Sequence, residues 1–270
     1  MLTAKGCVLV GGALGWAPFA SDYDVNMPED TNPYAIFGYT FLGLTVPSTL
    51  LMCMGAAFGS SLASNPTWQA GYDENSMGGV FGAALAPLNG FGTFLMIILA
   101  LSIIGGNLPN SYSLALSFQA VHPWFIKVPR FLWTTIGTIV YIAIGIAASY
   151  DFATALSTFM AILSYYLAMY TTILLEEHFI FRKTNFANYN LEAWNDKHKL
   201  PWGVASMVAF CFGMMAVVLG MAQTWYMGVI GRQIGDPAYG GDIAFELAAC
   251  FVGIIYPIGR ILEKKYRGFY

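Results

Sequence analysis

An uncharged apolar run from Phe91 to Phe118 constrains this chain more than any other feature of its sequence. Runs of this length cross the hydrocarbon core of a bilayer as helices. The middle of the run reads Gly105-Gly106-Asn107-Leu108-Pro109-Asn110. Glycine and proline weaken a helix, and asparagine amides at bilayer depth are costly unless they face protein, water or a ligand. The pattern predicts a helix interrupted at the midplane, which is typical of a transporter that holds a polar solute there.

The composition excludes most other classes of protein. Only 10% of the residues are charged and 57% are hydrophobic, whereas a soluble domain carries about 25% charged residues. The net charge of −3 gives no reason to expect a nucleic-acid partner. We expect no enzyme, because no phosphate-binding loop, nucleophile elbow or catalytic His–Cys set is present. We expect the four cysteines to be small core residues and no metal or cofactor to be bound, because Cys7, Cys53, Cys211 and Cys250 lie in apolar segments without metal-ligand spacing.

Hydrophobic windows predict an all-α integral membrane protein with a single membrane domain. Polar connections separate the windows, and the connection after the second has room for one or two short surface helices. The seven predicted membrane spans cover residues 4–20, 34–62, 90–119, 131–150, 152–177, 202–228 and 243–262.

Lysine and arginine residues predict the orientation. Ten of them fall in alternate connections or at the C-terminus, and only Lys5 and Arg232 fall on the other side. This asymmetry places the C-terminus and the 178–201 loop in the cytoplasm. Two interpretations fit an outside N-terminus: a seven-helix receptor, or the C-terminal part of a larger protein. The ten residues are Lys127, Arg130, Arg182, Lys183, Lys197, Lys199, Arg260, Lys264, Lys265 and Arg267.

Two segments carry residues suited to a ligand. At residues 15–23, an apolar helix runs into Gly15, Trp16 and Pro18, so Trp16 is either a flat surface for an aromatic ligand or an interfacial tryptophan at a helix end. The amides of Asn107 and Asn110 match the N–H and C=O edge of a nucleobase, and the alternative is an inter-helix hydrogen bond.

Acidic residues provide candidates for proton movement. Glu246 lies in the first turns of the last span, where it is either proton-linked or a helix N-terminal acid. We interpret Glu176-Glu177-His178 as part of a solvated cytoplasmic loop, because its mixed charges match no metal-ligand pattern. Gln223, near the end of the sixth span, is interpreted as a packing or interface residue.

Several motifs together resemble those of the fungal purine–cytosine permeases, which are nucleobase:cation symporters of family 1. The resemblance runs from end to end of the chain. Its motifs are GWAPFASDY at residues 15–23, GNLPN at 106–110, LEEHF at 175–179, YNL at 189–191, WN at 194–195 and GGDI before FEL at 240–247.

The resemblance implies a twelve-helix transporter with two inverted repeats (a LeuT-type fold), of which this chain would supply helices six to twelve. It implies nucleobase import with a proton, sodium being left open, across the plasma membrane. Trp16 would stack on the base, and Pro109 and Asn110 would form the pair that reads its polar edge, with Asn107 just before them. Gly106 departs from the family pattern, which places another asparagine there. Besides lipid, the expected partners are a full-length relative or a second copy of the chain.

Overall fold

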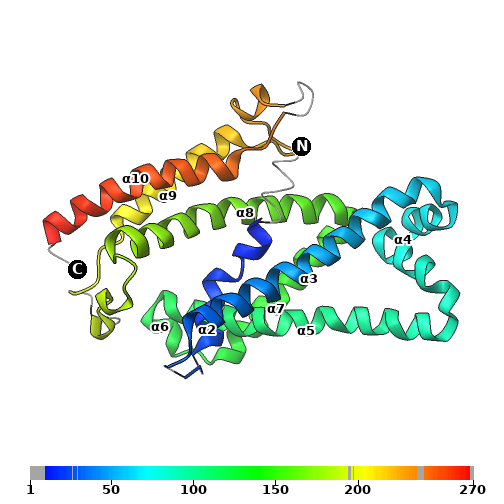
Figure 1. The fold of residues 1–270 in the computed structure, drawn as a ribbon, viewed down its shortest axis with the longest axis horizontal. Helices are drawn as coiled ribbons and strands as arrows, with labels where there is room; N and C mark the ends of the chain where they lie inside the picture. The colour runs from blue at the N-terminus through cyan, green and yellow to red at the C-terminus, as the bar shows by residue number, and fades with distance from the viewer. Residues whose placement is uncertain are drawn as a thin grey trace. The chain divides into compact units, whose positions relative to one another are not determined.

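The computed structural model describes residues 10–25, 27–28, 30–193, 196, 198–235 and 240–267. These residues are almost entirely helical, and among them the only β pairing is an isolated bridge between Ala222 and Met227 (Figure 1). This confirms the predicted all-α class. Within the described ranges, four apolar helical stretches are long enough to cross a membrane: Pro33–Ser64, Pro66–Val121, Arg130–Phe181 and Ala244–Tyr266.

The chain divides into two compact units, which are described separately. One unit is formed by residues 22–146 and the other by residues 1–21 and 147–270. The first predicted span, residues 4–20, lies partly outside the described residues.

The unit of residues 22–146 is a set of long apolar helices with short connections. Asn32 begins α3 by accepting a hydrogen bond from the Tyr34 amide, and proline follows at the first helical position. α4 bends at Asn75 and Ser76 into two helical segments, where one or two short helices were predicted. The helices are α3 (Pro33–Ser61), α4 (Pro66–Leu85), α5 (Asn89–Val121), α6 (Pro123–Ile126) and α7 (Arg130–Ala148), the last ending in the other unit.

The predicted interruption at residues 105–110 is wrong, because α5 is one continuous helix of 33 residues with Pro109 inside it. A proline removes one backbone hydrogen bond, and in an apolar helix neighbouring side chains can satisfy the backbone groups that are freed. Two side chains here bond to the backbone one turn earlier. Ser111 Oγ donates to the Asn107 carbonyl at 3.0 Å, and Asn110 Nδ2 donates to the Gly106 carbonyl at 3.4 Å.

The other unit is built on three helices that meet at small residues. α9 (Val204–Gly220) and α10 (Ala244–Arg267) lie side by side, and α8 (Phe152–Glu176) packs against α10 (Figure 1). Close contact between apolar helices in a membrane depends on small side chains at the interface. The buried core here includes Ala161, Ala168, Ala205, Ala209, Ala244 and Ala248, together with Met169 and Val252.

Two predicted span ends are corrected by the structure. α8 continues past residue 177 into a π-helical turn, η5 (Glu177–Phe181). The sixth span, predicted to reach residue 228, ends as a helix at Gly220. The backbone turns back there: the Gly228 amide bonds to the Met221 carbonyl at 2.8 Å, and Ile230 bonds to Leu219 at 2.9 Å. These contacts satisfy carbonyls at the end of α9, so the apolar segment need not continue as helix.

The prediction that the cysteines are buried core residues is wrong for the three that the structure describes. Cys53, Cys211 and Cys250 are exposed on helix surfaces, and Cys7 lies outside the described residues. In a bilayer, such a surface meets lipid or another apolar segment, which suits a small apolar side chain.

Gly213 lies where α8, α9 and α10 meet, and we expect Gly213→Ala to destabilise the chain. A Cβ at this position would lie 2.6 Å from Met169 Sδ and 2.8 Å from Val252 Cγ2, and both neighbours are fully buried. Overpacking of this kind costs about 1–3 kcal/mol. Thermal unfolding of the purified chain in detergent measures the effect. Gly145→Ala in α7 is the matched control, because nothing lies within 4 Å of the added carbon there; an equal loss in both variants would contradict the packing argument.

Candidate functional site

The segment around Trp16 is discontinuous, as the sequence predicts. Helical turns over residues 10–14 give way to a turn at Gly15 and Trp16, then to η1 (Ala17–Phe19) and α2 (Ala20–Asp24). Pro18 lies inside η1, where its fixed φ suits the first turn. The indole of Trp16 is 44% exposed. A flat aromatic side chain is therefore presented at a break in the helix.

The helical turns before Trp16 are held against α8 by two close contacts. A Cβ on Gly11 would lie 2.5 Å from Ser164 Cβ, so only glycine allows the two backbones to approach this closely. Ser164 is fully buried, and Leu167 lies within 4 Å of the carbon that Gly15 lacks. The position of Trp16 is therefore fixed relative to the middle of α8.

The two predicted amides lie on α5. Asn107 and Asn110 are three residues apart, so their side chains lie on the same face of the helix. Asn107 and Pro109 are half-buried and Asn110 is exposed. The Asn110 amide makes one long hydrogen bond among the described residues, to Gly106, and retains an acceptor and a second donor for another partner.

The predicted site residues belong to different units. Trp16 lies in the unit of residues 1–21 and 147–270, and Asn107, Pro109 and Asn110 lie in the unit of residues 22–146. Glu246 lies in the first turn of α10, where it is exposed and where a carboxylate interacts favourably with the helix N-terminus.

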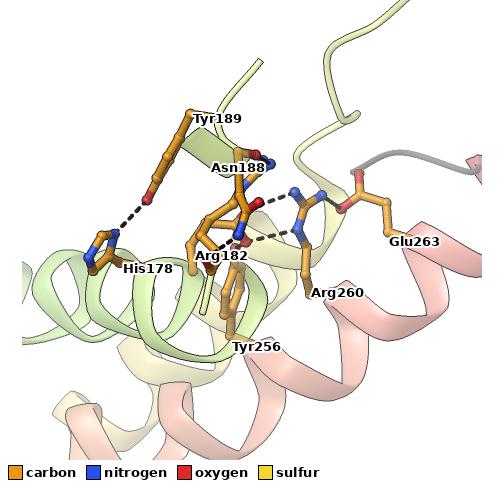
Figure 2. A network of polar contacts seen from close by, with 8 residues as sticks. His178, Arg182, Asn188, Tyr189, Tyr256, Arg260 and Glu263 are labelled. Atoms are coloured by element: carbon orange, nitrogen blue, oxygen red, sulfur yellow. Dashed lines mark hydrogen bonds and ion pairs between the residues drawn. The ribbon is translucent and has the colours of Figure 1, made fainter. Parts of the chain in front are cut away.

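A polar network surrounds Glu177 at the other end of α8 (Figure 2). Its carboxylate accepts hydrogen bonds from Arg260 Nε at 3.1 Å and Nη2 at 3.0 Å, from Tyr256 Oη at 2.9 Å and from Arg182 Nε at 3.1 Å. Arg260 is only 4% exposed and also lies 3.5 Å from Glu263. The interpretation of Glu177 as a solvated loop residue is therefore wrong, because its charge is paired with a buried guanidinium.

The same network orders the start of the following loop. Arg182 Nη1 donates to the Asn188 carbonyl at 2.6 Å, and Asn188 Nδ2 returns a bond to the Arg182 carbonyl at 2.8 Å. His178 Nδ1 lies 3.1 Å from the Tyr189 hydroxyl, and the Arg182 guanidinium lies over the Tyr189 ring (Figure 2). The LEEHF motif thus joins α8, α10 and the loop that follows.

A second buried network joins α8 to the turn before α10. The Tyr165 hydroxyl donates to Asp242 Oδ2, and Gln223 Nε2 donates to the same oxygen at 2.8 Å. Asp242 Oδ1 accepts from the Ala244 amide at 3.1 Å, which caps α10. Gln223 therefore bonds both to Tyr165 of α8 and to a carboxylate that is 4% exposed.

Sequence reasoning missed both networks because their members are far apart in the chain. Glu177 and Arg260 are separated by 83 residues, and Tyr165 and Asp242 by 77. One signal was available: Arg260 lies inside the last predicted span, and a cation in a membrane segment requires a partner.

A cavity of about 660 Å³ lies between α8 and α9 beside the Glu177 network. Its walls are mainly aromatic and aliphatic, and none of the predicted ligand residues lines it. Aromatic rings come from Tyr166, Tyr170 and Phe210. The carboxylate of Glu177 also lines the cavity, but it is already hydrogen-bonded to Arg260. The cavity therefore offers few polar groups to a nucleobase.

Comparison with known families identifies the class of protein. A family model described as "Permease for cytosine/purines, uracil, thiamine, allantoin" matches residues 6–232. The chain belongs to this permease family. This confirms the resemblance based on the motifs, and the alternative of a seven-helix receptor finds no support. No solved structure matches the chain.

Curated relatives of this permease chain are transporters rather than enzymes. It is 46% identical over 265 residues to the purine-cytosine permease FCY2 of Saccharomyces cerevisiae, covering 97% of the chain and 49% of the relative. It is 40% identical to the purine-cytosine permease fcyB of Emericella nidulans, covering 97% and 51%. It is 30% identical to the vitamin B6 transporter TPN1 of Saccharomyces cerevisiae, covering 94% and 51%. The chain spans about half the length of the curated relatives it matches.

Proposed function

We propose that this chain forms the substrate-binding C-terminal part of a permease that imports purines and cytosine. The observation that carries the proposal is the identity of 46% to a purine-cytosine permease over 97% of the chain. The lower identity of 30% to a vitamin B6 transporter favours a nucleobase over a pyridine as substrate. In this proposal the Trp16 ring stacks on the base and the Asn110 amide reads its polar edge, with Asn107 beside it.

The proposed architecture is the one that the motifs imply. The seven spans would be helices six to twelve of a twelve-helix inverted-repeat transporter, with the C-terminus in the cytoplasm of a plasma-membrane protein. The substrate would move with a cation, a proton in the first instance, as the protein alternates between outward-facing and inward-facing states.

Affinity arithmetic indicates that further contacts are needed. A micromolar dissociation constant corresponds to about −8 kcal/mol. One aromatic stack contributes about 1–3 kcal/mol, and each net hydrogen bond contributes about 1 kcal/mol. We therefore propose that the complete site also uses residues from a full-length relative, from a second copy of this chain, or from helices preceding these seven.

Uptake of labelled cytosine and adenine by transporter-deficient fungal cells tests the proposal. The chain is expressed as printed and its membrane insertion is confirmed by surface labelling. The proposal expects uptake that excess unlabelled base abolishes, or, where the inserted chain alone is silent, uptake restored by adding the N-terminal half of FCY2. Pyridoxine is the control competitor, because the proposal places a nucleobase rather than a pyridine in the site. An inserted chain that shows no base-specific uptake in either arrangement contradicts the proposal.

A further inference from the structure

Glu176 presents a carboxylate oxygen that the rest of the described structure leaves unsatisfied. It is the last residue of α8, within an apolar stretch that runs from Arg130 to Phe181. Its Oε2 atom is buried and has no hydrogen-bond partner among the described residues. Buried polar atoms in native proteins almost always have a partner, so an exception requires an explanation.

The carboxyl group of Glu176 lies against Gly253 of α10. A Cβ on Gly253 would lie 3.4 Å from Glu176 Oε1 and 3.7 Å from Thr172 Cγ2, so the side chain occupies the space that the glycine leaves. The Thr172 hydroxyl donates its proton to the Ala168 carbonyl at 2.8 Å. The Thr172 hydroxyl is therefore committed to its own helix and does not donate to Glu176.

The charged groups on the surrounding elements have other partners. Arg260 of α10 and Arg182 after η5 both bond to Glu177, and Glu263 lies beside Arg260. His178 of η5 faces Tyr189, and Lys264 of α10 lies over the Phe181 ring. Across the described residues no cation pairs with Glu176. Two adjacent acids of one motif thus have opposite surroundings: Glu177 is fully paired and Glu176 is not.

An ionised carboxylate in apolar surroundings without a cation or donor is costly, whereas a neutral carboxylic acid is tolerated. We propose that Glu176 carries a proton in the conformation described here and is the residue that releases the coupled proton to the cytoplasm. This inference rests on the proposed function as a cation symporter. When the α8–α10 interface becomes hydrated, the O–H bond of the acid breaks and the proton passes to water, leaving the carboxylate; the acid forms again when a proton arrives with the next substrate.

Infrared spectroscopy of the purified chain tests the protonation directly. We expect a carboxylic-acid C=O band at neutral pH that shifts in heavy water and disappears in Glu176→Gln. The matched control is Glu192→Gln, an exposed acid in the following loop, which should leave the band unchanged. Labelling the unmodified chain with carbon-13 glutamate provides a second measurement that does not depend on how a variant folds. A chain without a protonated glutamic acid, or a band that persists in Glu176→Gln, overturns the proposal.

Transport measurements separate this inference from the proposed function. The variant is tested in the form that supports uptake, either the chain alone or the chain with the N-terminal half of FCY2. Glu176→Gln should still exchange internal for external base. It should lose both the accumulation of base and the dependence of that accumulation on external pH. Loss of exchange and accumulation together would show that Glu176 acts through folding or substrate binding, which would overturn the role in proton release. If the unmodified chain showed no base exchange but retained the acid band, the function proposal would fail and the protonation of Glu176 would stand.

Discussion

Replacing Glu177 by glutamine is expected to lower the free energy of unfolding by about 3–5 kcal/mol, which is typical when one partner of a buried ion pair is removed. Glu177 is the only carboxylate that bonds to both Arg260 and Arg182 among the described residues. Its neutral amide would leave two guanidinium groups without the carboxylate that neutralises both, and Arg260 is only 4% exposed. Thermal unfolding of the purified chain in detergent, followed by tryptophan fluorescence, measures the loss.

Two comparisons show whether the loss comes from the ion pair. Glu192→Gln removes an exposed acid from the loop that follows η5 and should leave the unfolding temperature unchanged. The double variant Glu177→Leu with Arg260→Met should be more stable than Glu177→Gln alone, because it also removes a buried charge that would keep only its 3.5 Å contact with Glu263. A Glu177→Gln chain as stable as the unmodified one would show that the network contributes nothing to the fold.

Hydrophobic windows predicted the spans, and the match is close where the helix begins at a capping residue. The span expected over residues 34–62 is α3 (Pro33–Ser61), because Asn32 caps the helix and a proline occupies its first position. A proline was also taken as a sign of a helix break at Pro109, and there the prediction was wrong. A proline removes only one hydrogen bond from a helix, and a long apolar segment in a membrane has no better alternative than helix. The helical end at Gly220 was missed for the opposite reason, since contacts with the turn at Gly228 stop a run that is mostly apolar.

The sequence alone could single out the predicted ligand residues, but it could not predict the two polar networks. Trp16 and Asn110 stand out locally, because an aromatic ring or an amide beside a glycine and a proline is unusual in an apolar run. The bonds from Tyr165 and Gln223 to Asp242 depend on how α8 meets the α9–α10 turn, and no local pattern specifies that packing. The difference between Glu176 and Glu177 likewise depends on which residue of α10 each one faces, Gly253 or Arg260.

Replacing Asn110 by alanine is expected to weaken nucleobase binding by about 5- to 150-fold, the equivalent of the 1–3 kcal/mol that a bidentate amide contributes. The amide makes only one long bond within α5, and alanine favours helix, so insertion and helix content should be unchanged. Competition with labelled cytosine and adenine measures the affinity, and circular dichroism checks the helix. Ser102→Ala is the matched control in the same helix, because that hydroxyl bonds only to its own backbone, at Leu99. Unchanged affinity in Asn110→Ala would exclude the amide from the site, and the base would then have to be read by residues outside α5.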